Sequence, residues 1–311
     1  MGYDDKIIFK DREPEVPEFI IERDDEGMET PEVPKGVLAL LRRKKWLRRL
    51  LKAIAVVLLV ALTLWAYEAW NYYVNIGVPV STKPSENIAK LQMPPAEEKA
   101  RVVHTADSVL GVDLDFYAIY GLRANIEFEE PDTTDANVYL YCRSADHKED
   151  STYLGSLVVN GEERQRDRNR LGYMAMVGDR MVIGVSRSEK VKDYVMENGG
   201  SFFRQIVLVS DGVIPSSFPL HGKVERKAIG LMRKGGKERL YFISTRNKET
   251  LWDFADALRE YGFVDAIYIT GGTDYCYYRS SGGKRHDIGD INNYPHKKWK
   301  GVIPWLVLRK K

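Results

Sequence analysis

The segment LWDFADALREYGFVDAIYITGGTD, residues 251–274, contains the clearest structural pattern in this chain of 311 residues. From Leu251 to Leu258, apolar side chains recur at the i, i+3, i+4 and i+7 spacing of an amphipathic helix, and Gly262 is placed to end that helix. The apolar run VDAIYIT follows at once and is typical of a buried strand. The segment therefore predicts a helix, a strand and then a turn at two glycines.

The glycine turn, formed by Gly271 and Gly272, follows the carboxyl end of the predicted strand. Open sheets often bind their ligands at this end of their strands, so the turn is a candidate for a loop that binds a substrate. A glycine pair after a strand is also a common tight turn with no further role. Position alone does not distinguish these two interpretations.

The residues upstream of this segment predict further strands and one more helix. We therefore expect the α+β class, a mixed sheet with flanking helices in one soluble domain, residues 101–311. The predicted elements are a strand in NVYLYC (137–142), two strands around a Gly178-Asp179 turn in GYMAMVGDRMVIGV (172–185), a helix with Ser188 as N-cap in SEKVKDYVMENGG (188–200), a strand and an Asp211-Gly212 turn in FFRQIVLVSDGVI (202–214), and a hairpin closed by Gly235-Gly236 in RKAIGLMRKGGKERLYFIS (226–244).

Charge is distributed unevenly along the chain, although the formal net charge is only +2. Residues 1–36 contain twelve Asp and Glu against five Lys and Arg, whereas residues 42–52 contain seven basic residues and no acidic one. Outside this basic cluster there is no electrostatic pattern of nucleic-acid binding, so we expect no nucleic acid partner. The acidic segment, residues 1–41, is predicted to be a disordered cytoplasmic tail that can bind a cytoplasmic protein.

An apolar segment directly follows the basic juxtamembrane cluster. Residues 53–74, AIAVVLLVALTLWAYEAWNYYV, are long enough to span about 30 Å of hydrocarbon, and aromatic residues gather at their far end. We expect this segment to bind the lipid bilayer as a single-pass helix, with the N-terminus in the cytoplasm by the positive-inside rule. A buried core helix is the alternative, because Glu68 lies near the far end. Residues 75–100 are predicted to be a polar linker to the soluble domain.

The few cysteines and histidines of the chain allow few metal or redox sites. Cys142 and Cys276 are compatible with one disulfide in an oxidising compartment, or with two separate buried thiols. His221, His286 and His296 show no metal-ligand spacing, so no zinc site is expected. The serines show no nucleophile-elbow pattern.

Three segments, taken in order, resemble one family: NGGSFF (198–203) followed by LVSDG, RKAIGLMRKGG (226–236), and residues 251–274. They are similar to the phosphodiester glycosidase domain, and the resemblance covers about residues 170–311. The compact form looks most similar to members from Bacteroidetes-type bacteria, which implies a cell inner membrane and a periplasmic domain. The resemblance also implies a hydrolase that acts on sugar-1-phosphate diesters of envelope glycans.

The family pattern can be matched to this sequence residue by residue. An asparagine-glycine turn precedes a phenylalanine-rich strand, and Asn198 matches that asparagine; an arginine precedes a small residue and a glycine on the next strand, and Arg226 matches that arginine. The loop after the third strand is similar to Asp-Gly-Gly-Gly-Ser, and Gly271 and Gly272 match two of its glycines. The sequence departs from the pattern at Thr270, which occupies the position of the family's aspartate.

This departure affects the chemistry that the resemblance implies. A phosphodiester glycosidase cleaves the bond between an anomeric carbon and a phosphate oxygen through an oxocarbenium-like transition state. Arg226, with Arg204 as a second candidate, is expected to bind the phosphate, with a surface salt bridge as the alternative role. Asn198 is expected to position the sugar or a water molecule, and the amides of the glycine turn add donors.

The carboxylate is the missing component of this site. Thr270 cannot act as a base, nor can it hold a divalent cation such as calcium as a carboxylate does. Asp274 is the candidate replacement, although it lies four residues further along the chain and catalytic geometry tolerates little displacement. No other cofactor is expected.

Two hypotheses therefore remain open. The first is a membrane-anchored periplasmic enzyme that hydrolyses sugar-1-phosphate diesters of the cell envelope. The second is a non-catalytic protein that binds envelope glycan, or that uses the domain and the acidic tail as interaction surfaces. The second draws support from Thr270 and from the length of the tail.

Overall fold

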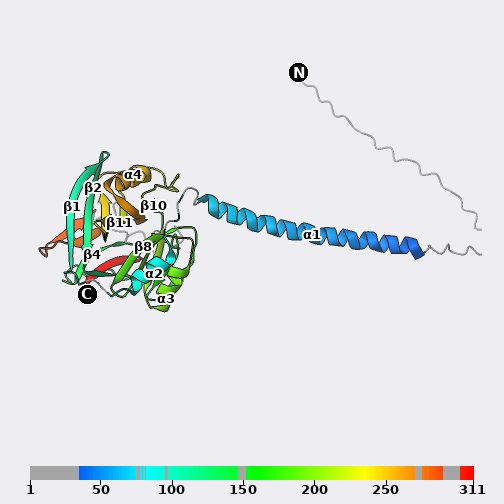
Figure 1. The fold of residues 1–311 in the computed structure, drawn as a ribbon, viewed down its shortest axis with the longest axis horizontal. Coiled ribbons are helices and arrows are strands. Elements are labelled where there is room, and N and C mark those ends of the chain that lie inside the picture. The colour runs from blue at the N-terminus through cyan, green and yellow to red at the C-terminus, as the bar shows by residue number, and fades with distance from the viewer. Residues whose placement is uncertain are drawn as a thin grey trace, which may run out of the picture. The chain divides into compact units, whose positions relative to one another are not determined.

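The chain forms two units in a computed structural model, Met1–Thr63 and Leu64–Lys311, and every strand that the structure describes lies in the second (Figure 1). The structure describes residues 35–74, 78, 80, 82–94, 97–145, 152–269, 275–289 and 302–311.

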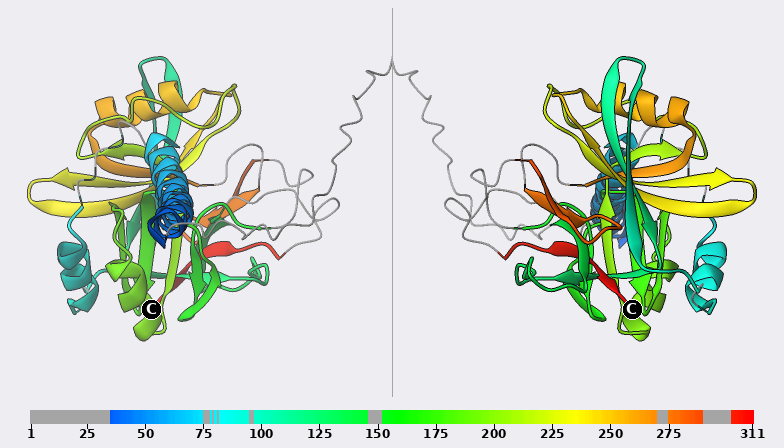
Figure 2. Two further views of the ribbon diagram at one scale, coloured as in Figure 1. Left: turned by 90° about the vertical axis from the view of Figure 1, so that its right-hand side faces the viewer. Right: turned by 90° about the vertical axis from the view of Figure 1, so that its left-hand side faces the viewer.

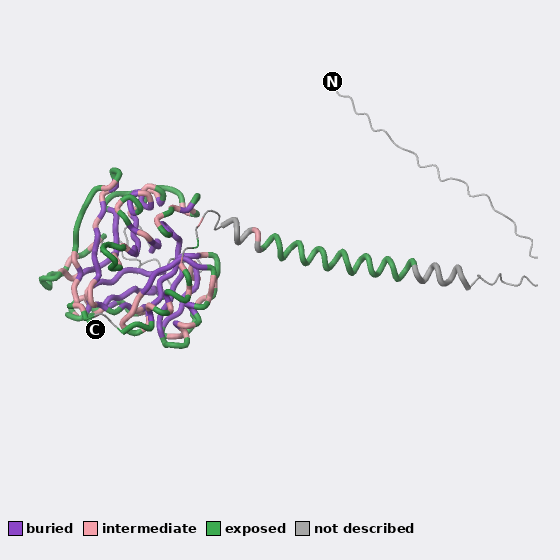
Figure 3. Tube along the Cα trace, viewed as in Figure 1, coloured by how far each residue is buried: buried purple, intermediate pink, exposed green. Residues whose placement is uncertain are grey.

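Helix α1, Lys35–Val74, contains the predicted membrane span. Within it, Lys44–Tyr67 is long and apolar enough to cross a membrane, and none of these side chains is buried in the protein (Figure 3). The alternative of a buried core helix is therefore not supported. The helix begins inside the segment predicted as a disordered tail, residues 1–41, because the residues just before the basic cluster are good helix formers.

The strands of the second unit form three sheets among the described residues. In the first sheet the order is β1 (Arg101–Val109), β2 (Val112–Tyr120), β12 (Lys237–Thr245), β11 (Lys227–Lys234), β13 (Phe263–Ile269) and β10 (Val207–Ser210). In the second it is β15 (Arg285–Ile288), β14 (Cys276–Arg279), β4 (Val138–Arg143), β16 (Trp305–Lys310) and β3 (Leu122–Glu127). In the third it is β6 (Glu162–Gln165), β5 (Leu157–Val159), β9 (Ser201–Gln205), β7 (Gly172–Val177) and β8 (Arg180–Val185).

The α+β class is confirmed, but the expected single mixed sheet is wrong. Every ladder between the described strands is antiparallel. The crossover from β12 through α4 (Leu251–Tyr261) to β13 does produce two strands that run in the same direction. However, β11 lies between them and pairs with both, so no parallel ladder forms.

Helix α4 has the start and end that the sequence predicts. The Thr250 side chain accepts a hydrogen bond from the Asp253 amide, and Gly262 ends the helix in a left-handed conformation. The helix covers one face of the first sheet (Figure 2). Its apolar side chains pack there with Phe116, Ile243 and others. The opposite face of this sheet packs into a larger core that the other two sheets share.

Helices α2 (Pro84–Gln92) and α3 (Lys190–Glu197) cover the third sheet, and they lie at the other end of the domain from α4 (Figure 1). The position of α2 is a correction, because residues 75–100 were predicted to be a linker. Its Asn87 and Leu91 are buried, and the Asn87 amide donates to the Tyr173 hydroxyl and to the Ile183 carbonyl. The segment is polar and contains prolines, and its few buried positions are too few to be recognised from composition.

Candidate functional site

The carboxyl end of β13 is the place where the glycine loop leaves the first sheet. Residues 270–274 themselves lie outside the described residues, so the predicted roles of Thr270, Gly271, Gly272 and Asp274 stay predictions. The strands before and after this loop in the chain, β13 and β14, are described. Lys227 at the start of β11 pairs with Ile269, the last residue of β13.

Arg226 directly precedes β11, and its guanidinium group is held by backbone carbonyls. Its Nε donates to the Glu249 carbonyl at 2.9 Å, and its Nη2 donates to the Gly222 carbonyl at 2.7 Å. The side chain is 2 % exposed and lies over the Tyr268 ring. Nη1 has no acceptor among the described residues. The buried arginine is thus oriented by two fixed bonds, with one nitrogen left to donate.

The neighbouring Lys227 faces the other side of the sheet, because side chains alternate along a strand. It is also 2 % exposed, and its charge acts on the thiol of Cys142 in the second sheet. Cys142 and Cys276 are both buried, are not joined by a disulfide in this structure, and share a hydrogen bond. A buried cation and two thiols therefore lie together beneath the strand end.

Four rings lie in contact on this same side of the first sheet. His104 stacks on Tyr117 at 4.9 Å between ring centroids, Tyr117 lies 4.8 Å from Tyr278, and Tyr278 stacks on His286 at 4.6 Å. Burial and the nearby Asp115 carboxylate raise the pKa of Tyr117 well above its usual value. Tyr117 is therefore a neutral phenol at any physiological pH.

Asp115 joins this group of rings to the solvent-exposed rim. Its carboxylate lies 2.8 Å from Nε2 of His104 and 3.2 Å from Nε of Arg246, and its side chain is 19 % exposed. On this face, His104, Asp115 and Arg246 therefore form a polar group at the exposed rim, whereas the rings of Tyr117 and Tyr278 are buried in the core behind it. A guanidinium group in such a place can bind phosphate oxygens.

Arg204, the second predicted phosphate ligand, lies in a different environment. It belongs to β9 in the third sheet and is 1 % exposed. Its Nη1 donates to the Ser186 carbonyl at 2.7 Å, and its Nη2 donates to the Ser188 carbonyl and to the Glu189 carboxylate. Both terminal nitrogens of Arg204 therefore donate to protein acceptors, so this arginine stabilises the fold.

Asn198 also has a local structural role. It is the C-cap residue of α3, and its side-chain amide donates to the Tyr194 carbonyl at 2.8 Å. The glycine that follows, Gly199, has a positive φ, as a turn after a helix requires. This helix lies at the end of the domain opposite α4 (Figure 1). Arg226 directly precedes β11, whose first residue pairs with Ile269, and Arg204 lies two residues before Ile206, whose carbonyl accepts a hydrogen bond from the Tyr268 amide of β13.

Lys227, Asp115 and His104 were not predicted as site residues from the sequence, whereas a pairing of Cys142 with Cys276 was one of two expected alternatives. The strand VDLDFYAIY does carry a signal, since Asp113 and Asp115 alternate with apolar residues. Which strand lies beside it depends on long-range pairing, and sequence spacing does not contain that information.

No cluster of three or more metal-ligating side chains occurs in the described parts of the chain. The calcium expectation stays untested, because residues 270–274 and 290–301 lie outside them.

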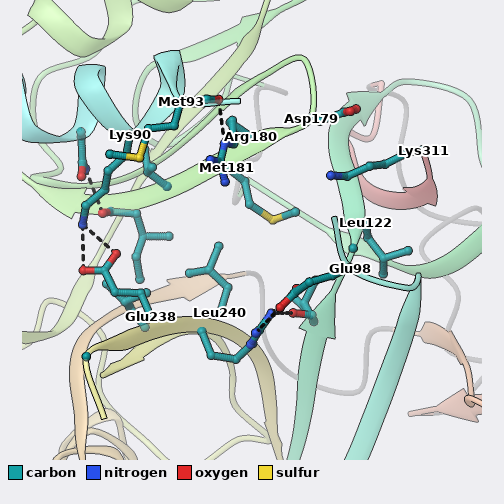
Figure 4. Close-up of a pocket in the computed structure, with 18 residues that line it drawn as sticks. Lys90, Met93, Glu98, Leu122, Asp179, Arg180, Met181, Glu238, Leu240 and Lys311 are labelled. Atoms are coloured by element: carbon teal, nitrogen blue, oxygen red, sulfur yellow. Dashed lines mark hydrogen bonds and ion pairs between the residues drawn. The ribbon is translucent and has the colours of Figure 1, made fainter. Parts of the chain in front are cut away.

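A cavity of about 410 Å³ lies elsewhere, between α2, β8 and β12 (Figure 4). Ion pairs cross its rim from Lys90 to Glu238 and from Arg239 to Glu98. Apolar side chains form much of its wall, and none of the predicted site residues lines it. Because its charged residues are largely paired with one another, it offers little for a phosphodiester.

Comparison with known proteins gives one family. A model of the family described as phosphodiester glycosidase matches residues 141–306. The match begins in β4 and ends in β16, so it starts upstream of residue 170, where the sequence resemblance was expected to begin. No curated protein matches the sequence.

Two solved structures share low similarity with the chain. The catalytic domain of zebrafish N-acetylglucosamine-1-phosphodiester alpha-N-acetylglucosaminidase, auto-inhibited by its pro-peptide, is 12% identical with a TM-score of 0.46, covering 75% of this chain and 87% of that chain. A hypothetical protein from Synechocystis is 11% identical with a TM-score of 0.47, covering 70% of this chain and 64% of that chain.

Proposed function

This chain belongs to the phosphodiester glycosidase family, and from that premise we propose that it hydrolyses sugar-1-phosphate diesters of envelope glycans. The reaction cleaves the bond between the anomeric carbon and the phosphate oxygen, and water adds to the sugar. The observation that carries the proposal is the oriented Arg226 beside the family's catalytic loop segment.

Arg226 is proposed to bind the phosphate. Two of its nitrogens are fixed by backbone carbonyls, so the third is held in one direction at little cost in side-chain entropy. A guanidinium group stabilises the negative charge that accumulates on the leaving phosphate monoester as the glycosidic bond breaks. Because phosphate is a good leaving group, charge stabilisation contributes more here than a strong general acid.

The loop from Thr270 to Asp274 is proposed to line the anomeric carbon. Asp274 would then supply the carboxylate that stabilises the oxocarbenium-like sugar or activates water, alone or through a calcium ion. Gly271 and Gly272 would supply amide donors. The family pattern carries the roles of the two glycines, whereas Asp274 would replace the aspartate that the family has at position 270. Asn198, predicted to position sugar or water, caps α3 instead and has no part in this proposal.

The apolar helix is proposed to anchor the domain in the cell inner membrane of a bacterium. The basic cluster, residues 42–52, favours a cytoplasmic N-terminus, so the domain would face the periplasm and the envelope glycans there. The acidic tail would remain able to bind a cytoplasmic partner. Labelling intact cells with a reagent that cannot cross the inner membrane tests this topology, and protection of the domain would contradict it.

Hydrolysis is tested with the full chain in detergent and a panel of sugar-1-phosphate diesters, with and without calcium. For Arg226→Lys we expect kcat/KM to fall by about 100-fold, because lysine cannot keep the two carbonyl bonds and also aim a donor at phosphate. Arg233→Lys is the matched control in β11, the strand that follows Arg226; its side chain is half exposed, and its kcat/KM should be unchanged. Thermal unfolding of each variant separates loss of chemistry from loss of fold.

A second function is favoured by one observation, the threonine at position 270. If the wild-type chain hydrolyses no diester, the enzymatic proposal is wrong, and binding of the same diesters by calorimetry then tests a glycan-binding protein. Thr270→Asp distinguishes the cases further. Activity gained by this variant would identify a site that has lost only its carboxylate.

A further inference from the structure

We propose that Cys142 and Cys276 are a disulfide-forming pair that ties β14 to β4, where β14 begins two residues after the 270–274 segment in the chain. The bond itself does not depend on the proposed function; only its effect on hydrolysis does. Three features of the structure carry the inference: the pairing of the two strands, the burial of the thiols and the position of the pair in the chain.

The strand register places the two cysteines opposite each other. In the β14–β4 ladder, Tyr277 pairs with Tyr141 and Tyr278 with Leu140, so Cys276 and Cys142 occupy the next position. Directly opposed residues of antiparallel strands have Cα atoms about 4.5–5.5 Å apart. A disulfide spans Cα separations of about 4.4–6.8 Å. The bond can therefore form without a shift of either strand.

The two side chains also point to the same side of the sheet. Cys142 and Cys276 belong to one buried core cluster, whereas Tyr141 and Tyr277 belong to another on the opposite face. The thiols hydrogen-bond with each other, and burial together with this bond raises the pKa of Cys142. Because the sulfur atoms already face each other, forming the bond requires little rearrangement.

The reaction needs an oxidant, and a small disulfide such as oxidised glutathione supplies it. One cysteine thiolate attacks the oxidant, forms a mixed disulfide and releases one thiol. The second cysteine thiolate then attacks its partner's sulfur, which expels the second thiol. In total, two protein thiols become one disulfide and one oxidant disulfide becomes two thiols. The Lys227 ammonium nearby lowers the pKa of Cys142, but burial outweighs it and the thiol form dominates at rest.

The position of the pair gives the bond a consequence. Cys276 follows Asp274 by two residues, so a fixed β14 fixes the chain at the exit of the proposed catalytic loop. The bond also closes a long loop between two strands, which restricts the unfolded chain more than the folded one. The oxidised protein should therefore unfold at a temperature roughly 5–10 °C higher than the reduced protein.

The test uses the full chain in detergent, incubated in glutathione buffers of graded ratio until reduced and oxidised starting samples converge. Free thiols are then alkylated in denaturant and counted by intact mass. In reducing buffer we expect two alkyl groups; in oxidising buffer we expect none, a mass lower by about 2 Da and the higher unfolding temperature. Two alkyl groups in every buffer, from both starting samples, would overturn the proposal.

Two variants serve as controls for the redox effect. Cys276→Ser and Cys142→Ala each keep a single thiol, so neither should show a redox-dependent unfolding temperature. If the unfolding temperature of either variant changes with the redox buffer as that of the wild type does, the change does not come from this disulfide and the proposal fails. Mass and unfolding need no substrate, so they decide the disulfide even if the chain proves inactive. A difference in hydrolysis rate between the two redox forms would test only the effect of the disulfide on the proposed function.

Discussion

Two arginines with similar sequence surroundings have different roles in this fold. Both Arg204 and Arg226 lie beside apolar strands, and both are almost fully buried. The difference is in their acceptors. Carbonyls and the Glu189 carboxylate accept from both terminal nitrogens of Arg204, whereas two carbonyls hold Arg226 and no residue that the structure describes accepts from its Nη1. Acceptors of this kind come from distant loops, so the sequence predicts a buried arginine without predicting what it binds.

Glu189 is predicted to stabilise the fold through Arg204 and Lys192. Burial alone would raise the pKa of Glu189, but hydrogen bonds and charge from Lys192 and Arg204 outweigh it and lower the pKa. Because the folded-state pKa lies below the unfolded one, the stabilisation is complete above the unfolded pKa, about 4.3, and is lost as pH falls. Glu189→Gln should lower the free energy of unfolding at pH 7 by about 2–3 kcal/mol.

Urea unfolding at several pH values measures this effect. The difference between wild type and Glu189→Gln should shrink as the pH falls below about 4, because the wild-type carboxylate then becomes protonated. Glu197→Gln, at an exposed position near the end of α3, is the control and should change stability little at any pH. A difference that stays constant with pH would show that the ion pair is not its source.

Elements whose signals are local were predicted well from the sequence. The β7–β8 and β11–β12 hairpins and helix α4 all appear where turn glycines and helical spacing place them. The segment FFRQIVLVSDGVI shows the limit. It reads as one strand, yet the chain changes sheets near Ile206, with β9 in the third sheet and β10 in the first. The sequence pattern does not show where a strand stops pairing in one sheet and starts pairing in another, because both halves of the run are buried and apolar.

The end of α4 gives a prediction at the scale of one element. Gly262 has a φ of +107°, and a Cβ added there would meet nothing within 4 Å. Gly262→Ala should therefore lower the free energy of unfolding by about 1–2 kcal/mol through backbone strain alone. Gly282→Ala is the matched control, because Gly282 has equal space around it without a positive φ.

Thermal unfolding of both glycine variants checks this prediction. The Gly282 variant should unfold within error of the wild type, and the Gly262 variant should unfold several degrees lower. Equal unfolding temperatures for the two would mean that the left-handed cap is not needed to turn the chain from α4 into β13. That turn sets the direction in which β13 reaches the proposed catalytic loop.

At the scale of the whole molecule, the start of the folded domain was predicted from composition, and the predicted position was wrong. The apolar helix itself was predicted correctly, because an uncharged apolar run of this length is uncommon in soluble domains. The domain was expected to begin at residue 101, after a linker, but α2 already packs on the third sheet. A short helix with two buried positions differs too little from a linker in polarity.

The folding unit is therefore predicted to include α2. A fragment of residues 75–311 should fold, whereas a fragment of residues 101–311 loses the buried Leu91 and leaves the Tyr173 hydroxyl without the Asn87 amide. The loss should lower the free energy of unfolding by about 3–5 kcal/mol, the sum of an apolar side chain and a buried hydrogen bond. Urea titration of the two fragments measures it. Leu91→Ala in the longer fragment should reproduce part of the loss, and equal urea midpoints for the two fragments would restore residues 75–100 to the role of a linker.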